Sequence, residues 1–355
     1  APQERRVHEI KSPDMGMLFH NSIEEFSKKL SIENLSWNDI DRDKSDEIVE
    51  KVLDKMIDDF QHGLLLSTNR YKYMVNRLKR ISKRALWTIT DHIRKGDFVP
   101  VQHEVIFGDA PNSKIPPIVI NLPDGEEVRL EGRIDRVDIL EGDKESFVKI
   151  IDYKSGTKAF SLSDAYYGLQ IQLLVYADAI ISNGEKLIKS DIYPAGVFYF
   201  KIDDPMIQSD EEDLEVIEKE IAKKLKLDGI ILKDINIVKA IDRDIEQTNN
   251  SSVIPVSINK DGSFSKTSSV IDKEELNILI SHVKGLISEI ADEILKGKIK
   301  IEPCKTDKYV SCAYCEYLSI CQFETSFEDN KYRNIKKLKD ADVISKIKEK
   351  LGGEE

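Results

Sequence analysis

The chain has 355 residues, of which 33% are charged and 40% are hydrophobic, and its formal net charge at pH 7 is −12. These proportions are typical of a folded globular protein and exclude a disordered chain. The negative balance excludes a protein that coats nucleic acid through its own positive charge, but not an enzyme that holds nucleic acid through metal ions.

The sequence carries no recognisable membrane or secretion signal. No apolar run reaches the length of a bilayer span, and the first residues lack the apolar core of a signal peptide. We therefore expect a cytoplasmic protein without membrane contact. The sequence begins with Ala1 rather than Met, from which we expect a fragment of a longer protein. It contains no P-loop motif, so we expect no ATPase of that class within it.

Residues 1–99 are predicted to be mainly helical because apolar residues recur there at helical spacing. The predicted helices span residues 14–30, 48–60 and 71–93. His20 would lie near the start of the first helix. Arginine and lysine residues are frequent between residues 70 and 84, where they could follow a phosphate backbone or simply solvate a helix face. We therefore assign none of them to a site.

From Pro100 onward, the apolar residues alternate as they do in β-strands. The predicted strands span residues 101–107, 118–122, 134–140 and 147–153. Turn-forming residues 141–144 separate the last two strands, which predicts a β-hairpin. Glu104 directly follows His103 in the first strand, and adjacent strand residues face opposite ways. The two side chains cannot easily bind one ion together, so we expect Glu104 to be structural.

Two carboxylates and one lysine are predicted to meet at the end of the hairpin. Asp135 lies in its first strand, whereas Asp152 and Lys154 share one face of its second strand. Close carboxylates repel each other unless a cation lies between them, and aspartate oxygens suit Mg²⁺ or Mn²⁺. Such an ion activates water and polarises a phosphoryl oxygen, and a neighbouring ammonium stabilises the developing charge. The alternative is a solvated hairpin edge with a surface ion pair.

A helix is predicted over residues 162–181, after the second strand of the hairpin. Gln172 and Tyr176 lie four residues apart and therefore on one face of it. Their side chains could contact a phosphate or a base, or they could pack the helix against the sheet. The elements predicted to follow are a buried strand at 195–202, an acidic insertion at 206–270 and an amphipathic helix at 274–295.

All four cysteines lie between residues 304 and 321. Three of them form a Cys-x2-Cys-x5-Cys motif, a spacing suited to one metal centre rather than to disulfides in a cytosolic protein. Zinc and a [4Fe-4S] cluster both bind thiolates at this spacing, and free or buried thiols are the third interpretation. The four residues are Cys304, Cys312, Cys315 and Cys321.

Four sequence blocks occur in a characteristic order: GMLFH from Gly16, GRIDRVD from Gly132, IIDYKSG from Ile150 and QLLVYADAI from Gln172. Together they resemble the PD-(D/E)XK nuclease superfamily, specifically its RecB-like branch. With the closing cysteine motif, the chain is similar to the family of AddB C-terminal nuclease domains. The resemblance extends from about Met15 to Phe323 and is weakest after residue 203.

The resemblance implies the fold and activity of that family. The expected fold is α/β, with a restriction-endonuclease-like core, a mixed central sheet flanked by helices, a helical N-terminal region and a C-terminal cysteine segment. The expected activity is Mg²⁺-dependent DNA exonuclease action within an AddAB-type helicase-nuclease that serves double-strand break repair and recombination. The expected partners are DNA and an AddA-like helicase-nuclease subunit.

The resemblance also implies roles for individual residues. Asp135 and Asp152 would hold Mg²⁺, or Mn²⁺, and Lys154 would activate water or stabilise the transition state. The remaining expected residues are His20 and the Tyr153 backbone carbonyl as further metal ligands, and Gln172 and Tyr176 as residues that position DNA.

In that family, a cysteine before the first helix completes a [4Fe-4S] cluster with the C-terminal cysteines. Here the implied ligands are Cys312, Cys315 and Cys321, and no cysteine precedes Cys304. Either truncation removed the first ligand or Cys304 substitutes for it. We favour truncation and expect the cluster to be incomplete or absent in this chain.

Two alternative functions remain at this point. One is a DNA-holding or subunit-docking module with an inactive nuclease site, and the other is a Cas4-like exonuclease. Cas4-like proteins are generally shorter and lack the long helical region before the strands. The predicted division of the chain is 1–99, helical part with the His motif; 100–205, nuclease core; 206–270, insertion; 271–325, helix and cysteine segment; 326–355, C-terminal tail.

Overall fold

The structure is a computed structural model that describes residues 12–60, 65, 67–142, 145–156, 159–186, 191–208 and 213–352. The α-helices are α1 (Ser12–Ile32), α2 (Arg42–Asp59), α3 (Asn69–Lys95), α4 (Leu162–Tyr166), α5 (Gln172–Asn183), α6 (Leu214–Lys224), α7 (Ile235–Ile241), α8 (Ile245–Thr248), α9 (Lys273–Leu295), α10 (Leu318–Cys321) and α11 (Asp340–Gly352). Short 3-10 turns occur at η3 (Gly184–Lys186) and η4 (Ser311–Tyr314). Within these ranges, none of the helices combines the length and apolar character needed to cross a membrane.

The strands assemble into one large sheet and two small ones. They are β1 (Val99–Phe107), β2 (Ile118–Asn121), β3 (Glu127–Leu130), β4 (Gly132–Leu140), β5 (Ser146–Lys154), β6 (Ile192–Lys201), β7 (Asp228–Leu232), β8 (Val270–Ile271), β9 (Cys304–Lys305) and β10 (Arg333–Asn334). The order in the six-stranded sheet is β1-β4-β5-β6-β7-β8. Parallel pairs β5–β6 and β7–β8 alternate with antiparallel pairs, so the sheet is mixed.

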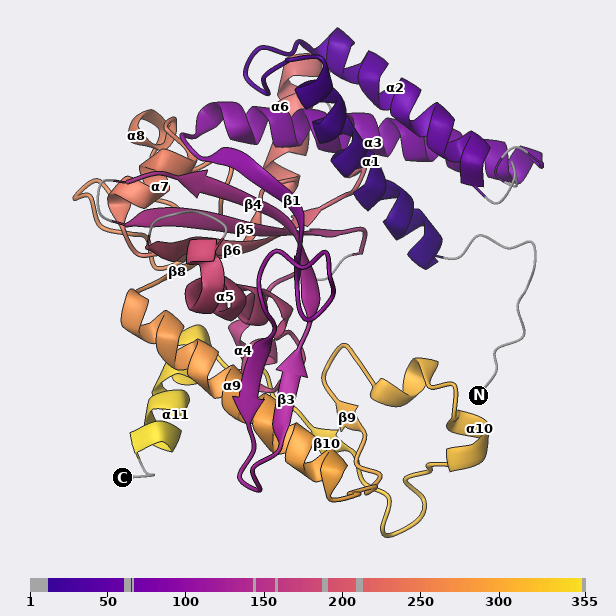
Figure 1. Ribbon diagram of the computed structural model, residues 1–355, viewed down its shortest axis with the longest axis vertical. Helices are drawn as coiled ribbons and strands as arrows, with labels where there is room; N and C mark the ends of the chain where they lie inside the picture. The colour runs from indigo at the N-terminus through magenta and orange to yellow at the C-terminus, as the bar shows by residue number, and fades with distance from the viewer. Residues whose placement is uncertain are drawn as a thin grey trace.

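Helices cover both faces of this sheet (Figure 1). The N-terminal helices α1, α2 and α3 lie on one side, and α5 with α9 lies on the other. Strands β4 and β5 are therefore buried almost throughout, as expected for central strands covered on both faces. The predicted fold, an α/β protein with a mixed central sheet flanked by helices, is confirmed.

The predicted hairpin is present as β4 and β5. The two strands pair antiparallel, with Asp138 opposite Lys149 and Arg136 opposite Ile151. Residues 143 and 144 of the predicted turn lie outside the described part of the chain. The hairpin fixes which side chains reach the two faces, because side chains of directly opposite residues share a face.

Two predicted segments differ in the structure. The single helix predicted over residues 162–181 is divided into α4 and α5, and Gly168 between them has a φ of +79°. That left-handed conformation favours glycine and ends a helix, so Gln172 becomes the first residue of α5. The segment predicted as an insertion contributes β7 and β8 to the edge of the main sheet.

Candidate active site

A cavity of about 450 Å³ lies where α1, β4, β5 and α5 converge. It contains every residue that the sequence analysis assigned to the nuclease site. The lining residues are His20, Arg133, Asp135, Asp152, Tyr153, Lys154, Ser155, Gly156, Gln172 and Tyr176. The folded chain thus brings together the four sequence blocks, although their roles in chemistry remain predictions.

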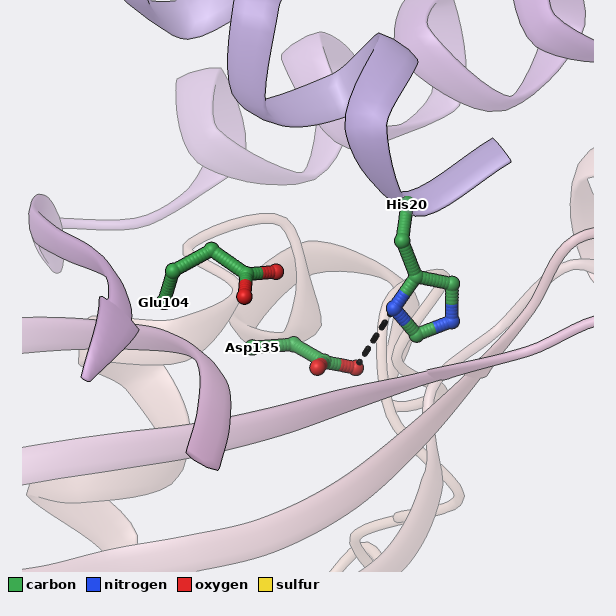
Figure 2. A group of neighbouring side chains, drawn as sticks. All are labelled: His20, Glu104 and Asp135. Carbon is green, nitrogen blue, oxygen red and sulfur yellow. Dashed lines mark ion pairs between the residues drawn. The ribbon is translucent and has the colours of Figure 1, made fainter. Parts of the chain in front are cut away.

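His20 and Asp135 meet across the backbone of Tyr153. The Tyr153 amide donates a 2.7 Å hydrogen bond to Asp135 Oδ2, and His20 Nε2 lies 2.9 Å from the Tyr153 carbonyl oxygen. His20 Nδ1 lies 3.4 Å from Asp135 Oδ2, the contact drawn in Figure 2. If Nε2 carries the proton and donates it to the carbonyl, Nδ1 keeps its lone pair toward the aspartate.

The glycine of the GMLFH block explains how α1 approaches the site. A Cβ at Gly16 would lie 3.4 Å from Ser155 Oγ, in the loop that follows β5. A larger side chain there would push α1 away from that loop. His20 lies one helical turn further on and in the middle of α1, rather than near its start as predicted.

Glu104 belongs to this site, and the expectation that it is only structural was wrong. Its carboxylate, the His20 ring and the Asp135 carboxylate each present a potential ligand atom within 4.8 Å of the others (Figure 2). Residues 103 and 105 of β1 pair with 136 and 134 of β4, which places Glu104 opposite Asp135. Glu104 and His103 do face opposite ways, but the histidine that joins Glu104 is His20. The register of β1 against β4 was the signal that could have revealed it.

Asp152 is the buried carboxylate on β5. Its side chain is 3% exposed, and its Oδ2 lies 2.7 Å from Lys154 Nζ. Burial raises the pKa of Asp152 to about 6, and the charge of Asp135 adds to this shift, whereas Lys154 opposes it. Two carboxylates in a poorly solvated pocket are therefore held at an electrostatic cost that a cation would relieve.

A second carboxylate effect appears at His20. Burial alone lowers the pKa of the imidazole, but the hydrogen bond and charge of Asp135, with the charge of Asp152, outweigh it. The pKa of His20 is therefore raised above its ordinary value. The imidazole responds to the same negative charge that would attract a metal ion.

Lys154, Gln172 and Tyr176 form a hydrogen-bonded row along the pocket. Lys154 Nζ donates to Gln172 Oε1 over 2.8 Å, and Gln172 Nε2 donates to the Tyr176 hydroxyl over 2.7 Å. Gln172 therefore contacts the lysine directly, in addition to facing the pocket. Burial raises the pKa of Tyr176, so this phenol stays protonated at neutral pH.

The donor set fits a divalent cation. Carboxylate oxygens with one imidazole nitrogen suit Mg²⁺ and Mn²⁺, with Mn²⁺ the more tolerant of nitrogen. Ligand atoms bonded at about 2.1 Å lie within about 4.2 Å of each other, close to the 4.8 Å limit that His20, Glu104 and Asp135 satisfy. The raised pKa of Asp152 records the same excess of negative charge from the other side of the pocket.

The cysteines do not converge in the same way. Cys304 is buried, Cys312 is partly exposed, and Cys315 and Cys321 are exposed, all as free thiols. In the described part of the chain, they form no group of three potential metal ligands with atoms within 4.8 Å of one another. The iron-sulfur assignment therefore stays a prediction.

Comparison with known proteins gives matches over nearly the whole chain. The family model of the PD-(D/E)XK nuclease superfamily matches residues 2–322. The chain is similar to proteins named as the B chain of an ATP-dependent helicase/deoxyribonuclease: 53% identical over 348 residues in Alkaliphilus metalliredigens, 54% over 347 residues in Alkaliphilus oremlandii and 44% over 350 residues in Thermoanaerobacter sp. strain X514. Each match covers 98% of this chain but only 30% of the relative, so the chain spans about 30% of their length.

Proposed function

Because this chain belongs to the PD-(D/E)XK nuclease superfamily, we propose that it is a metal-dependent deoxyribonuclease domain that hydrolyses phosphodiester bonds in DNA. The resemblance drawn from the four sequence blocks is confirmed at the level of the family. One observation carries the proposal: a histidine, three carboxylates and a lysine converge at one pocket from separate segments of the chain.

We assign the metal ligands to Asp135, Asp152 and Glu104, with His20 beside them and the Tyr153 carbonyl as a further oxygen. Mg²⁺ or Mn²⁺ held there would lower the pKa of a bound water and polarise a phosphoryl oxygen. The Tyr153 amide fixes the orientation of Asp135 through its hydrogen bond, so this ligand is preorganised.

Lys154 supplies the positive charge next to the reacting phosphate. Its ammonium is held between Asp152 and Gln172, which restricts it to the pocket side of β5. From there it can stabilise charge that develops on the phosphate oxygens. Tyr176 accepts its hydrogen bond from Gln172, which leaves the phenol proton free to be donated to DNA.

The relatives' names support a role for the domain within a larger assembly. We propose that this chain is the nuclease part of an AddB-type protein, acts on DNA ends as an exonuclease with Mg²⁺, and works with an AddA-like helicase-nuclease subunit. Its setting would be double-strand break repair and recombination in the bacterial cytoplasm. A [4Fe-4S] cluster on Cys312, Cys315 and Cys321, with Cys304 as a possible fourth ligand, is part of the same proposal.

The test is cleavage of end-labelled single-stranded and duplex DNA by the chain with Mg²⁺ or Mn²⁺. Asp135→Asn and Lys154→Ala should each abolish cleavage while thermal unfolding stays cooperative. Asp124→Asn, which removes an exposed carboxylate in the β2–β3 turn, is the matched control and should cut at the unmodified rate. Binding of DNA without hydrolysis under both metals, or full activity of the two site variants, would overturn the proposal.

A further inference from the structure

Arg133 is a pocket residue to which neither the sequence blocks nor the metal site gives a role. It lies on β4 two residues before Asp135, so both side chains leave the strand on the same face. Arg133 Nε lies 2.6 Å from Glu104 Oε2. Its side chain is 58% exposed, whereas that of Glu104 is 14% exposed. A solvent-exposed cation is thus paired with a largely buried carboxylate.

That carboxylate is also one of the three potential metal ligands. Glu104, His20 and Asp135 present their ligand atoms within 4.8 Å of one another. A divalent ion bound to Glu104 would lie within a few ångströms of the guanidinium, and two cations at that distance repel each other strongly. Arg133 and the metal ion therefore compete for Glu104, and the exposed arginine is the one that can move.

The backbone of Glu104 shows that this carboxylate is placed with some strain. Its φ is +52°, a left-handed conformation that residues other than glycine rarely adopt. A partly exposed ion pair contributes little to stability, so the Arg133–Glu104 pair does not explain why the strain is kept. Placing a carboxylate beside His20 and Asp135 does explain it.

The released guanidinium would face the pocket mouth with unused hydrogen-bond donors. Lys154, by contrast, is already held by Asp152 and Gln172. Arginine binds phosphate through two parallel N–H groups, a geometry that an ammonium does not offer. Around the pocket, carboxylates outnumber the lysine and arginine side chains until a divalent ion reverses the balance, so phosphate binding and metal binding favour each other.

We propose that Arg133 is a further DNA-binding residue whose guanidinium pairs with Glu104 in the metal-free site and transfers to a backbone phosphate when a divalent cation occupies Glu104. The inference rests on the proposed function, because it takes DNA as the substrate. Its consequence is thermodynamic coupling: the metal ion strengthens DNA binding partly by freeing Arg133, and DNA strengthens metal binding by the same factor.

The test measures the affinity of a short fluorescein-labelled single strand by fluorescence anisotropy, in EDTA and in Ca²⁺. The readout is the ratio of the two dissociation constants. In the unmodified chain, Ca²⁺ should tighten binding, and Arg133→Gln should reduce this gain about tenfold, the effect of losing a charge-assisted bidentate contact. Arg133→Lys keeps the charge without the planar fork and should give an intermediate ratio.

Arg129→Gln is the matched control. Arg129 is an exposed arginine outside the pocket that pairs with Asp109 at 2.7 Å, so the variant removes the same charge and a similar ion pair. Its ratio should equal that of the unmodified chain. In a second measurement without DNA, Arg133→Gln should bind Mn²⁺ severalfold more tightly in calorimetry, because the competing cation is gone.

An unchanged ratio in Arg133→Gln, or an unchanged Mn²⁺ affinity, would overturn the inference. Neither measurement depends on cleavage. If the unmodified chain fails to cut DNA with Mg²⁺ or Mn²⁺ while the ratio still depends on Arg133, the hydrolytic function fails and the coupling stands.

Discussion

Arg136 and Asp138 form a two-pronged ion pair inside the protein, with Nε and Nη2 each 2.6 Å from a carboxylate oxygen. Both belong to the same sequence block as Asp135, but they leave β4 on the opposite face. Lys149 on β5 adds a contact of 2.9 Å to Asp138 Oδ2. Their side chains are at most 3% exposed. This half of the block therefore holds the strands together behind the pocket.

Asp138→Asn should destabilise the chain by about 3–5 kcal/mol, because it leaves two buried cations without their counter-ion. Urea unfolding followed by circular dichroism measures the loss. Asp109→Asn is a control with the same fork geometry, since Arg129 contacts both Asp109 oxygens at 2.7 Å on the surface. That change should cost less than about 1 kcal/mol. Equal losses in the two variants would show that burial of the Arg136 pair has no energetic importance.

Glu104→Gln should weaken metal binding at least tenfold while leaving the fold intact. The amide keeps the shape of the side chain but removes the charge from the group that also contains His20 and Asp135. The measurement is thermal unfolding with increasing Mn²⁺, because an ion at one hundred times its dissociation constant stabilises the folded state by about 2.7 kcal/mol. Glu127→Gln on β3 removes an exposed carboxylate and should leave the Mn²⁺ response unchanged. The same response in both variants would remove Glu104 from the ligand set.

Gln172→Ala should lower kcat more than it raises KM, by about tenfold to a hundredfold. Its Oε1 accepts the hydrogen bond that holds Lys154 Nζ, and misplacing a catalytic group by about 1 Å costs up to about a hundredfold in rate. Steady-state cleavage of labelled DNA separates the two constants, and Gln247→Ala on the exposed face of α8 is the control. A change confined to KM would instead mean that Gln172 acts as a DNA contact, as the sequence analysis expected.

Much of the site could be predicted from sequence because its residues lie in short blocks. Alternation along one strand is enough to place Asp152 and Lys154 on a common face, and helical spacing does the same for Gln172 and Tyr176. The structure brings these residues together in one pocket, as their blocks suggested. Their roles remain proposals for the assays described above.

Glu104 could not be found in this way because its position depends on how β1 pairs with β4. The two strands are separated in sequence by the β2–β3 hairpin, and a shift of one residue would have turned Glu104 to the other face. The break at Gly168 was missed for a related reason: apolar periodicity continues through it, and only the positive φ ends the helix. The close spacing of the cysteines likewise did not determine how their side chains are arranged.

His92 should make the stability of the chain depend on pH. It lies buried on α3, with its ring 6.0 Å from that of Phe200 on β6. Burial, reinforced by the positive charges of Lys149 and Lys95, holds the pKa of His92 well below its ordinary value. The folded state therefore keeps the imidazole neutral under conditions in which the unfolded chain, with a pKa of about 6.5, binds a proton.

The sign follows from that difference. Above about pH 6.5 neither state is protonated at His92, and the unfolding free energy is unaffected by it. As the pH falls below this value, the unfolded state gains the proton first, so stability declines until the folded pKa is reached. Between about pH 7.5 and about pH 5 the contribution amounts to about 2 kcal/mol. His92→Phe keeps an aromatic ring against Phe200 and should remove this part of the decline in urea unfolding. Parallel pH profiles for the two proteins would show that His92 does not titrate differently in the folded and unfolded states.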